Sequence, residues 1–170
     1  MITISVSNCN SINQKIYDDL ILNLQVHQLT CPCGVTGLLK VHGYYYRSVK
    51  LPTGKTRLSI TRLKCESCHK THAILPMIII PYSQVLMADQ LAAIEASKKQ
   101  KGYPELMSAN PEIDESNITS IIKRYKQHWK QRLLSAMIKI TTLQKLIERC
   151  FHHFKMNFMQ IKNTPNILFC

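Results

Sequence analysis

The order of apolar and polar positions predicts a short strand, a helix and a β-hairpin in the first part of the chain. Residues 2–6 alternate between apolar and polar side chains, as strands do, and residues 11–26 repeat apolar positions at helical spacing. Residues 38–51 and 56–64 are rich in Val, Leu, Ile and Tyr, and the Pro-Thr-Gly-Lys segment 52–55 between them predicts a hairpin turn. The apolar positions of the helix are Ile12, Ile16, Leu20 and Leu24.

Beyond Pro81 the pattern becomes helical. It predicts helices over residues 84–97 and about 104–109, and a third helix capped by Asp114 or Ser116. The third helix has one apolar face, which consists of Ile118, Ile121, Ile122, Tyr125, Trp129 and Leu133.

The apolar stripe of the third helix continues as far as Phe158 without an intervening glycine or proline. Because a single helix of that length would be unusual, we expect a break near Thr141-Thr142, where a threonine can cap a new helix. These elements predict an α+β chain with an N-terminal strand and helix, a hairpin region, a helical region and a C-terminal helix with a tail. The four regions span residues 1–29, 30–82, 83–140 and 141–170.

Composition indicates a globular protein of 170 residues, 45% of them apolar. The longest apolar run, residues 74–80, is interrupted by Pro76 and is far shorter than the ~20 residues that a membrane span needs. The N-terminal residues show no charged leader of the secretory type. We therefore expect a cytoplasmic protein that has no membrane partner.

The chain carries 22 Lys and Arg against 10 Asp and Glu, a formal charge of +12. An excess of this size favours a polyanionic partner, of which nucleic acid is the commonest, over a charge that only improves solubility. The basic residues are concentrated in two segments. Residues 40–72 contain eight of them opposed only by Glu66, and residues 123–132 contain five with no acid.

Four of the seven cysteines form two close pairs near the ends of the predicted hairpin. Without a secretory leader a disulfide framework is not expected, whereas four thiolates brought together by a hairpin bind a tetrahedral Zn²⁺. Gly34 would let the backbone turn beside the first pair. The sequence therefore predicts a structural zinc ribbon, with packing thiols as the alternative. The expected ligands are Cys31, Cys33, Cys65 and Cys68, and the expected free thiols are Cys9, Cys150 and Cys170.

Two other interpretations of this region receive less support. The segment Cys65-Glu-Ser-Cys68-His69 matches a c-type haem attachment motif, but that chemistry needs export and leaves the first cysteine pair without a role. Nearby histidines could replace a cysteine ligand, although solvated or core positions are favoured for them. These histidines are His42, His69 and His72.

The third helix also has a basic face. At 100° per residue, Thr119, Lys123, Lys126 and Lys130 fall on one side, about a third of a turn from the apolar stripe. A helix-turn-helix recognition helix requires this arrangement, and a solvated basic face is the alternative. Double-stranded DNA is the expected partner, and the candidate contacts are Arg47, Lys55, Arg57, Arg62, Asn117, Thr119, Ser120, Lys123, Arg124, Lys126 and Lys130. For Tyr44-Tyr45-Tyr46, ordinary sheet packing is favoured over stacking on exposed bases.

Several segments give the chain a resemblance to a known family. They are Cys31-Pro-Cys33-Gly34, His42-Gly43-Tyr44-Tyr45-Tyr46-Arg47, Arg62-Leu63-Lys64-Cys65-Glu66-Ser67-Cys68, Thr71-His72-Ala73-Ile74-Leu75-Pro76 and Ile80-Pro81-Tyr82. Over roughly residues 30–135 the chain resembles a bacterial domain of unknown function, akin to the N-terminal zinc-ribbon and helix-turn-helix part of insertion-sequence transposases. The resemblance implies DNA binding associated with mobile elements and zinc on the four paired cysteines. The first pair is more closely spaced than is usual in that family.

Catalysis is not expected. A nuclease core of the ribonuclease-H type needs acidic metal ligands on a substantial sheet, and none of the ten acids follows a convincing buried strand. The sequence thus predicts a transposon-related, zinc-stabilised DNA-binding protein without a nuclease core or a small-molecule substrate. Two alternatives are a truncated transposase relic and an interaction module that forms a homodimer through the C-terminal helix. The apolar face for that dimer would comprise Phe151, Phe154, Phe158 and Ile161.

Overall fold

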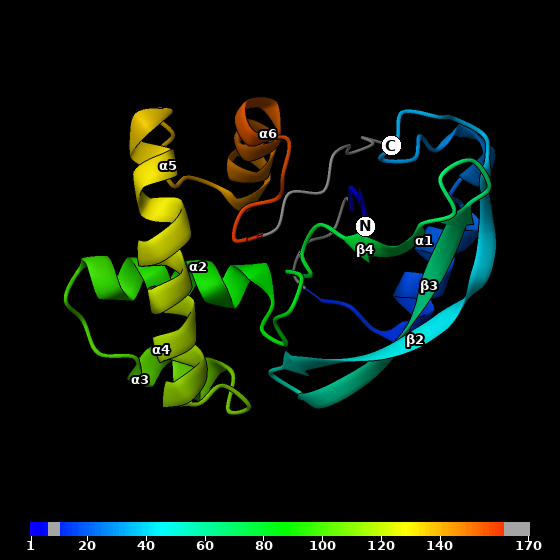
Figure 1. Cartoon of the computed structure of the whole chain (residues 1–170). Coiled ribbons are helices and arrows are strands. Elements are labelled where there is room, and N and C mark those ends of the chain that lie inside the picture. Colours follow the sequence, from blue (N-terminus) through cyan, green and yellow to red (C-terminus); the bar gives the residue numbers. More distant parts are fainter. Residues whose placement is uncertain (7–10, 162–170) are drawn as a thin grey trace.

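The computed structural model describes residues 1–6 and 11–161, and its strands form one sheet in the order β1-β4-β3-β2 (Figure 1). β1 is parallel to β4, whereas β4, β3 and β2 are antiparallel neighbours. The strands are β1 (Ile2–Ile4), β2 (Leu39–Leu51), β3 (Gly54–Cys65) and β4 (Thr71–Pro76). The predicted N-terminal strand and both hairpin strands are confirmed. β4 is a strand that the sequence pattern does not indicate, because its apolar residues belong to a run that continues beyond the strand to Ile80.

The chain is mixed α+β, as predicted, and its helices follow the expected order. They are α1 (Gln14–Leu22), a short 3-10 turn η1 (Val26–Gln28), α2 (Met87–Lys98), α3 (Pro104–Ala109), α4 (Glu115–Arg124), a π-helical turn η2 (Tyr125–Trp129), α5 (Lys130–Ser135) and α6 (Leu143–Phe154). Asp114 caps α4 and Thr142 precedes α6, which confirms both predicted boundaries. Within the described residues, none of these helices has the length and apolar character that crossing a bilayer requires.

α1 is shorter than predicted and buries a different side. Ile16, expected to be apolar core, is 38% exposed, whereas Tyr17 is fully buried. The reason is that α1 uses polar atoms to cover an open strand edge. β4 pairs only with residues 62–64 of β3, and α1 lies beside the rest of that edge.

Two side chains of α1 take the place of a neighbouring strand there. The Gln14 amide accepts the backbone N–H of Ser59 at 2.7 Å and donates to the Ser59 carbonyl at 3.3 Å. The Tyr17 hydroxyl accepts the N–H of Thr61 at 2.8 Å and donates to the carbonyl of Ile74 at 3.1 Å. Backbone groups that would otherwise be buried without partners are thereby satisfied.

The buried apolar side chains form two clusters, and Leu20 and Ile21 of α1 pack against both. The smaller cluster includes Leu63, Ile74 and the cysteines Cys31 and Cys65, with α1 packed against it. The larger cluster joins the opposite face of the hairpin to α2, α4, α5 and α6. Packing is therefore continuous across residue 82, and the boundary between the regions 30–82 and 83–140 stays a prediction.

The C-terminal helix buries its apolar face inside the chain. α6 ends at Phe154, where Lys155 takes a left-handed conformation, so the helix does not extend to Phe158 as the apolar stripe predicts. The rings of Phe154 and Phe158 stand edge-on to Trp129, with centroids 5.7 and 5.3 Å from it. Phe151 and Phe158 are buried as well, so most of the face predicted to form a homodimer is already covered by this chain.

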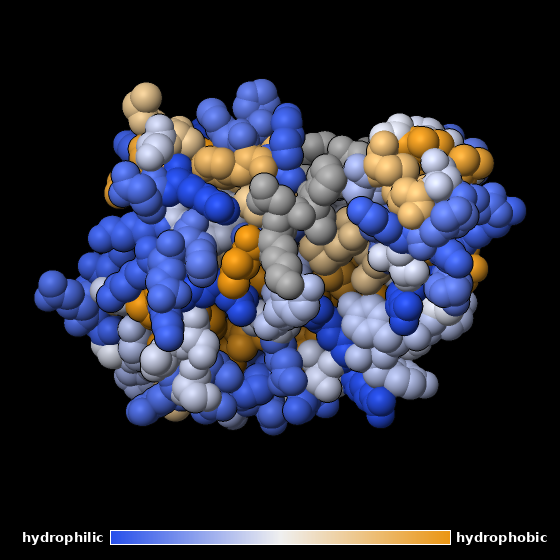
Figure 2. All heavy atoms as spheres, viewed as in Figure 1, coloured by the Kyte–Doolittle hydropathy of each residue, from blue (hydrophilic) through white to orange (hydrophobic). Residues whose placement is uncertain are grey.

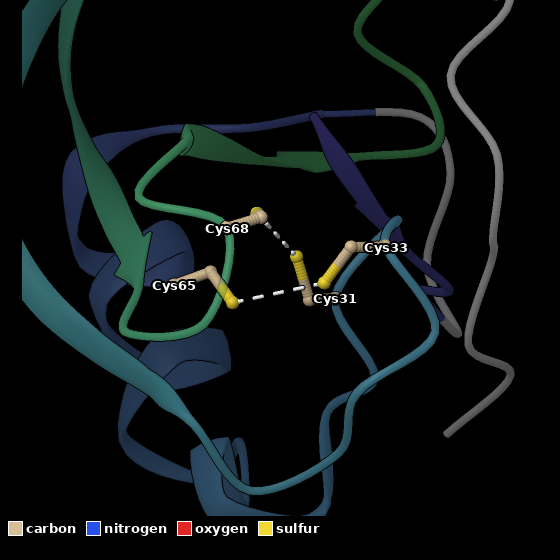
Figure 3. Close-up of side chains that lie close together, drawn as sticks. All are labelled: Cys31, Cys33, Cys65 and Cys68. Carbon is tan, nitrogen blue, oxygen red and sulfur yellow. Dashed lines mark hydrogen bonds between the residues drawn. The ribbon is translucent and has the colours of Figure 1, made fainter.

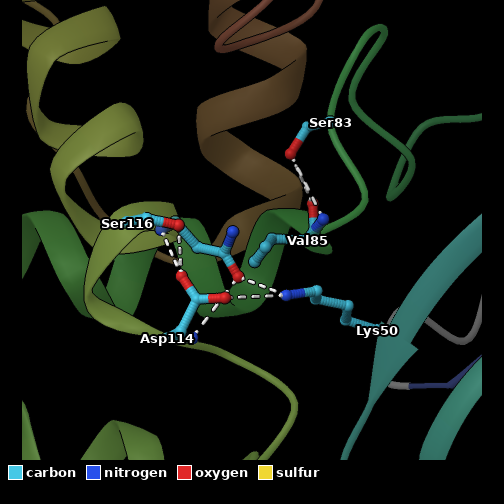
Figure 4. A network of polar contacts seen from close by, with 6 residues as sticks. Lys50, Ser83, Val85, Asp114 and Ser116 are labelled. Atoms are coloured by element: carbon cyan, nitrogen blue, oxygen red, sulfur yellow. Dashed lines mark hydrogen bonds and ion pairs between the residues drawn. The ribbon is translucent and has the colours of Figure 1, made fainter.

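Lys50, near the turn of the hairpin, connects the sheet to the start of α4 (Figure 4). Its ammonium group donates to Asn117 Oδ1 at 2.6 Å and lies 3.3 Å from Asp114 Oδ2. Its backbone N–H donates to the carbonyl of Gln84 at 2.8 Å. The turn end of the hairpin is therefore attached to the residues that cap α4.

We expect Tyr17→Phe to destabilise the fold, because it leaves the buried Thr61 N–H and Ile74 carbonyl without a partner. The loss should be about 1–3 kcal/mol in the free energy of unfolding. Tyr44→Phe, which removes an exposed hydroxyl, is the matched control and should change stability by less than ~0.5 kcal/mol. Urea unfolding followed by Trp129 fluorescence measures both, and equal stabilities for the two variants would contradict the role given to Tyr17.

We expect Lys50→Met to lower the free energy of unfolding by about 1 kcal/mol, because Asn117 and Asp114 lose a charged donor. Lys55 is paired directly opposite Lys50 and is exposed, so Lys55→Met removes the same charge without this contact. Thermal unfolding measures the melting temperatures of the two variants. Equal melting temperatures would show that the Lys50 contact does not hold the hairpin to α4.

Candidate metal centre and basic surfaces

The four paired cysteines meet at the end of the sheet opposite the hairpin turn (Figure 3). Cys31 and Cys33 lie on the loop before β2, Cys65 ends β3, and Cys68 lies on the turn between β3 and β4. Their sulfur atoms all lie within 4.8 Å of one another. This clustering confirms that the two pairs, distant in the sequence, converge.

The spacing of the sulfur atoms fits a single tetrahedral ion. Sγ of Cys31 is 3.6 Å from Sγ of Cys68, and Sγ of Cys33 is 3.8 Å from Sγ of Cys65. A tetrahedron with metal–sulfur bonds of ~2.3 Å places its sulfur atoms about 3.8 Å apart. A disulfide requires a bond of ~2.05 Å, so these sulfur atoms do not form disulfides with one another. They could hold a metal ion.

The two cysteine loops have the same hydrogen-bond pattern, and the first is one residue shorter. In the second loop the N–H of Cys65 donates to the carbonyl of Lys70, and the N–H of His69 donates to the carbonyl of Cys65. In the first loop Cys31 N–H donates to the carbonyl of Val35, and Gly34 N–H donates to the carbonyl of Cys31. The close spacing of Cys31 and Cys33 is therefore accommodated by a tighter turn.

In each loop the residue after the second cysteine has a positive φ. Gly34 has φ 95° and His69 has φ 58°. Glycine reaches such angles without steric cost, whereas a side chain makes them unfavourable. The glycine after Cys33 thus has the conformational role that the sequence predicts for it.

The surroundings of Cys31 and Cys65 shift the pKa values of their thiols in opposite directions. Burial raises the pKa of Cys31, whereas the backbone N–H of Cys68 hydrogen-bonds to Cys65 and lowers the pKa of that thiol. Uncompensated thiolates at a buried position such as Cys31 are costly, and a bound cation would remove this cost. The site therefore has the donor set and the burial expected of a metal centre.

Among the three histidines near the cysteines, only His72 contacts a sulfur atom. His72 is buried, and its Nε2 lies 3.4 Å from Sγ of Cys31. Burial lowers the pKa of His72 to about 4, so the ring is neutral at physiological pH. A hydrogen bond from this neutral imidazole would help to orient the Cys31 sulfur toward a bound ion. His42 and His69 are exposed and lie outside the cysteine cluster.

Residues 31–125 match a family described as a domain of unknown function, DUF6431. The chain belongs to this family. The DUF6431 region begins at the first cysteine of the cluster and ends at the first residue of the π-turn, so it contains the whole candidate metal centre together with α2, α3 and α4. No curated protein and no solved structure matched the chain in the corresponding searches.

Two residues of the DUF6431 region that are predicted to contact DNA make hydrogen bonds within the chain instead. The Arg47 guanidinium donates to the carbonyls of Ile80 and Ser83, the latter at 2.6 Å. The Asn117 amide completes the cap of α4 and accepts from Lys50. Neither residue is oriented toward a ligand, because both hold neighbouring segments in place.

The other predicted contacts are at or near the surface. Arg124 and Arg62 are partly buried, and the Arg124 guanidinium reaches the carbonyl of Tyr82 at 3.5 Å. Lys130 follows the π-turn, which inserts a residue into the helix and so changes the face on which later side chains lie. The exposed predicted contacts are Lys55, Arg57, Thr119, Ser120, Lys123, Lys126 and Lys130.

The π-turn divides the predicted basic face of the helix into two parts. Thr119, Lys123 and Lys126 line a hollow of about 510 Å³ together with Ser97 and Tyr103. Lys130 lines a different hollow. The sequence-based prediction that Lys130 shares the face of the other three assumes an uninterrupted α-helix, and the structure corrects it.

Cys9 and Cys170, which we expect to be free thiols, lie outside the described residues, whereas Cys150 is free and buried.

We expect the purified protein to contain about one metal ion per chain, since residues 1–6 and 11–161 contain one cluster of four cysteines. Cys65→Ser should abolish stoichiometric metal, and a chelator should lower the melting temperature of the wild type. Cys150→Ala removes a buried thiol outside the cluster and should keep the metal. Elemental analysis by mass spectrometry measures the content, and a folded, metal-free wild type would contradict the site.

Proposed function

We propose that the chain is a transposon-related DNA-binding protein in which a structural zinc ion holds the base of the hairpin and which carries no nuclease core. The resemblance to the N-terminal part of insertion-sequence transposases supports the relation to mobile elements, whereas the DUF6431 family itself has no assigned function. Four thiolates select zinc or iron–sulfur centres over hard cations, and single tetrahedral ions of this kind are most often zinc. Zinc is therefore the ion that we expect.

The observation that carries the proposal is that α4 and the start of η2 have a buried apolar side and an exposed polar side. Ile118, Ile121 and Tyr125 are buried in the core. Thr119, Ser120, Lys123 and Lys126 are exposed on the other side. A helix that packs through one side can present the other to the major groove.

The surroundings of α4 fit this role. α2 packs against both α3 and α4, and a short connection joins the six-residue α3 to α4 (Figure 1). In a three-helix variant of the helix-turn-helix, such as the homeodomain, the third helix enters the major groove. We infer that α4 is the recognition helix and that α2 and α3 support it.

Charge along α4 limits which of its turns would approach DNA. Asp114 and Glu115, at its start, are acidic and exposed and would repel phosphates. Lys123 and Lys126, two to three turns later, are exposed cations without such neighbours on the helix. We therefore place the contact at residues 119–126 and leave out Asn117 and Lys130.

The interaction-module alternative has less support than the DNA-binding proposal. Its predicted dimer face is largely buried within the chain, because Phe151 and Phe158 are core residues. Hydrophilic residues also cover most of the molecular face in Figure 2, where apolar residues appear only in small separate areas. A polar, basic surface favours a polyanion over an apolar partner.

We expect the double variant Lys123→Ala/Lys126→Ala to bind duplex DNA more weakly and with a smaller dependence on salt. The slope of log K against log[salt] should decrease in magnitude by about 2, because each lysine releases about one counterion when it contacts a phosphate. Fluorescence anisotropy with a labelled duplex at several salt concentrations measures this slope. The protein is used in its metal-loaded form.

The matched control is Lys15→Ala/Lys145→Ala. It removes the same charge from exposed positions on α1 and α6. This control should keep the wild-type slope. If both double variants change the slope equally, general charge accounts for binding and α4 is not the contact. If the wild type shows no salt-dependent binding, the DNA-binding proposal itself is overturned.

A further inference from the structure

Two tyrosines project from the hairpin into solvent. Tyr44 and Tyr46 are 64% and 65% exposed, although the sequence-based interpretation favours sheet packing for them. Both lie on the same face of β2, since alternate residues of a strand share a face. β2 is the outermost strand of the sheet. The two rings are therefore presented together at an open edge.

A β-bulge directs these rings outward. The pairing of β2 with β3 shifts register between Val41 and Gly43, so one residue of β2 has no direct partner. Such an insertion reverses which side chains face the core beyond it. After the bulge Val49 and Leu51 face the core and are buried, while Tyr44 and Tyr46 point away. The exposure of the rings thus follows from the backbone register of the hairpin.

Cations of β3 lie on the same face as the rings. The guanidinium carbon of Arg57 lies 4.0 Å from the centroid of the Tyr46 ring, and Lys55 is exposed near the turn. The residues opposite Tyr46 and Arg57 are the small side chains Ser59 and Ser48. Small neighbours leave the rings standing above the surface, and the stacked guanidinium restricts the orientation of Tyr46. We call Tyr44, Tyr46, Lys55 and Arg57 the tyrosine face.

We propose that the tyrosine face binds single-stranded nucleic acid by stacking unpaired bases on Tyr44 and Tyr46. Aromatic rings combined with cations suit a strand whose bases are open and whose phosphates lie beside them. In a duplex the bases are stacked on one another and offer no face to a tyrosine ring. This site shares no residue with α4, and the proposal does not depend on duplex binding by α4.

The test compares ring removal with ring retention. Tyr44→Leu/Tyr46→Leu keeps apolar side chains but removes the rings, whereas Tyr44→Phe/Tyr46→Phe keeps the rings and removes only the hydroxyls. Binding of fluorescein-labelled oligothymidylate and oligouridylate to the metal-loaded protein is followed by fluorescence anisotropy. We expect the leucine variant to bind at least about tenfold more weakly and the phenylalanine variant to bind like the wild type.

The two oligonucleotides distinguish DNA from RNA as the source of the strand, and tight binding of either one, lost in the leucine variant, supports the proposal. Lys123→Ala/Lys126→Ala separates this site from the proposed duplex site, because it should weaken duplex binding and leave oligothymidylate binding unchanged. Equal single-strand affinities for the leucine variant and the wild type would overturn the proposal. An equal loss of duplex and single-strand affinity in the leucine variant would also overturn it, in favour of a duplex surface.

Discussion

β2 and β3 pair along their whole length, from Leu39 opposite Cys65 to Leu51 opposite Gly54, and the other features of the structure depend on this pairing. At one end the ladder brings Cys65 beside the loop that carries Cys31 and Cys33. At the other end it places Lys50 against the cap of α4. The same ladder contains the bulge that orients the tyrosines. One antiparallel pair thus positions the candidate metal centre and both proposed binding surfaces.

The cysteine end of the ladder has little apolar packing of its own. The apolar cluster there is small and includes Cys31 and Cys65 among its buried members. Loops that are held by so few contacts open easily, because the entropy of ordering them exceeds what a small cluster contributes. A metal ion bound by all four thiolates would supply the missing contacts. A structural ion is therefore needed more at this end than at the turn, where the hairpin packs against the larger core.

Local sequence signals predict a large part of this arrangement. The hairpin is predicted from strand-forming residues on either side of a Pro and Gly turn, and the start of α4 from an acidic cap residue. The convergence of the cysteines also follows from the hairpin, because antiparallel strands bring the ends of the segment together. In each of these predictions, the residues that carry the signal are close in sequence or lie at the ends of two strands that a single turn connects.

The features that the sequence does not predict depend on contacts between residues distant in the sequence, or on an insertion that changes the register of a strand or helix. β4 leads into a continuous apolar run that ends at Ile80, and the periodicity of such a run does not separate a strand from a buried helix. The exposure of Tyr44 and Tyr46 depends on one unpaired residue near Gly43, and the position of Lys130 depends on the π-turn before it. Asn117 is a residue type that can read bases, but its side chain accepts a hydrogen bond from Lys50, which is 67 residues away in the sequence. A single insertion in a strand or helix changes the face of every later side chain, and composition carries no record of it.

The connection between the metal centre and α4 gives the proposed zinc a positional role in DNA binding. Zinc at the cysteines would fix the register of β2 on β3, and that register sets where the Lys50 ammonium lies. Lys50 in turn contacts Asp114 and Asn117, the two residues whose reciprocal hydrogen bonds begin α4. The ion would therefore act on α4, the proposed recognition helix, through one strand pair and one side chain, without approaching the nucleic acid itself.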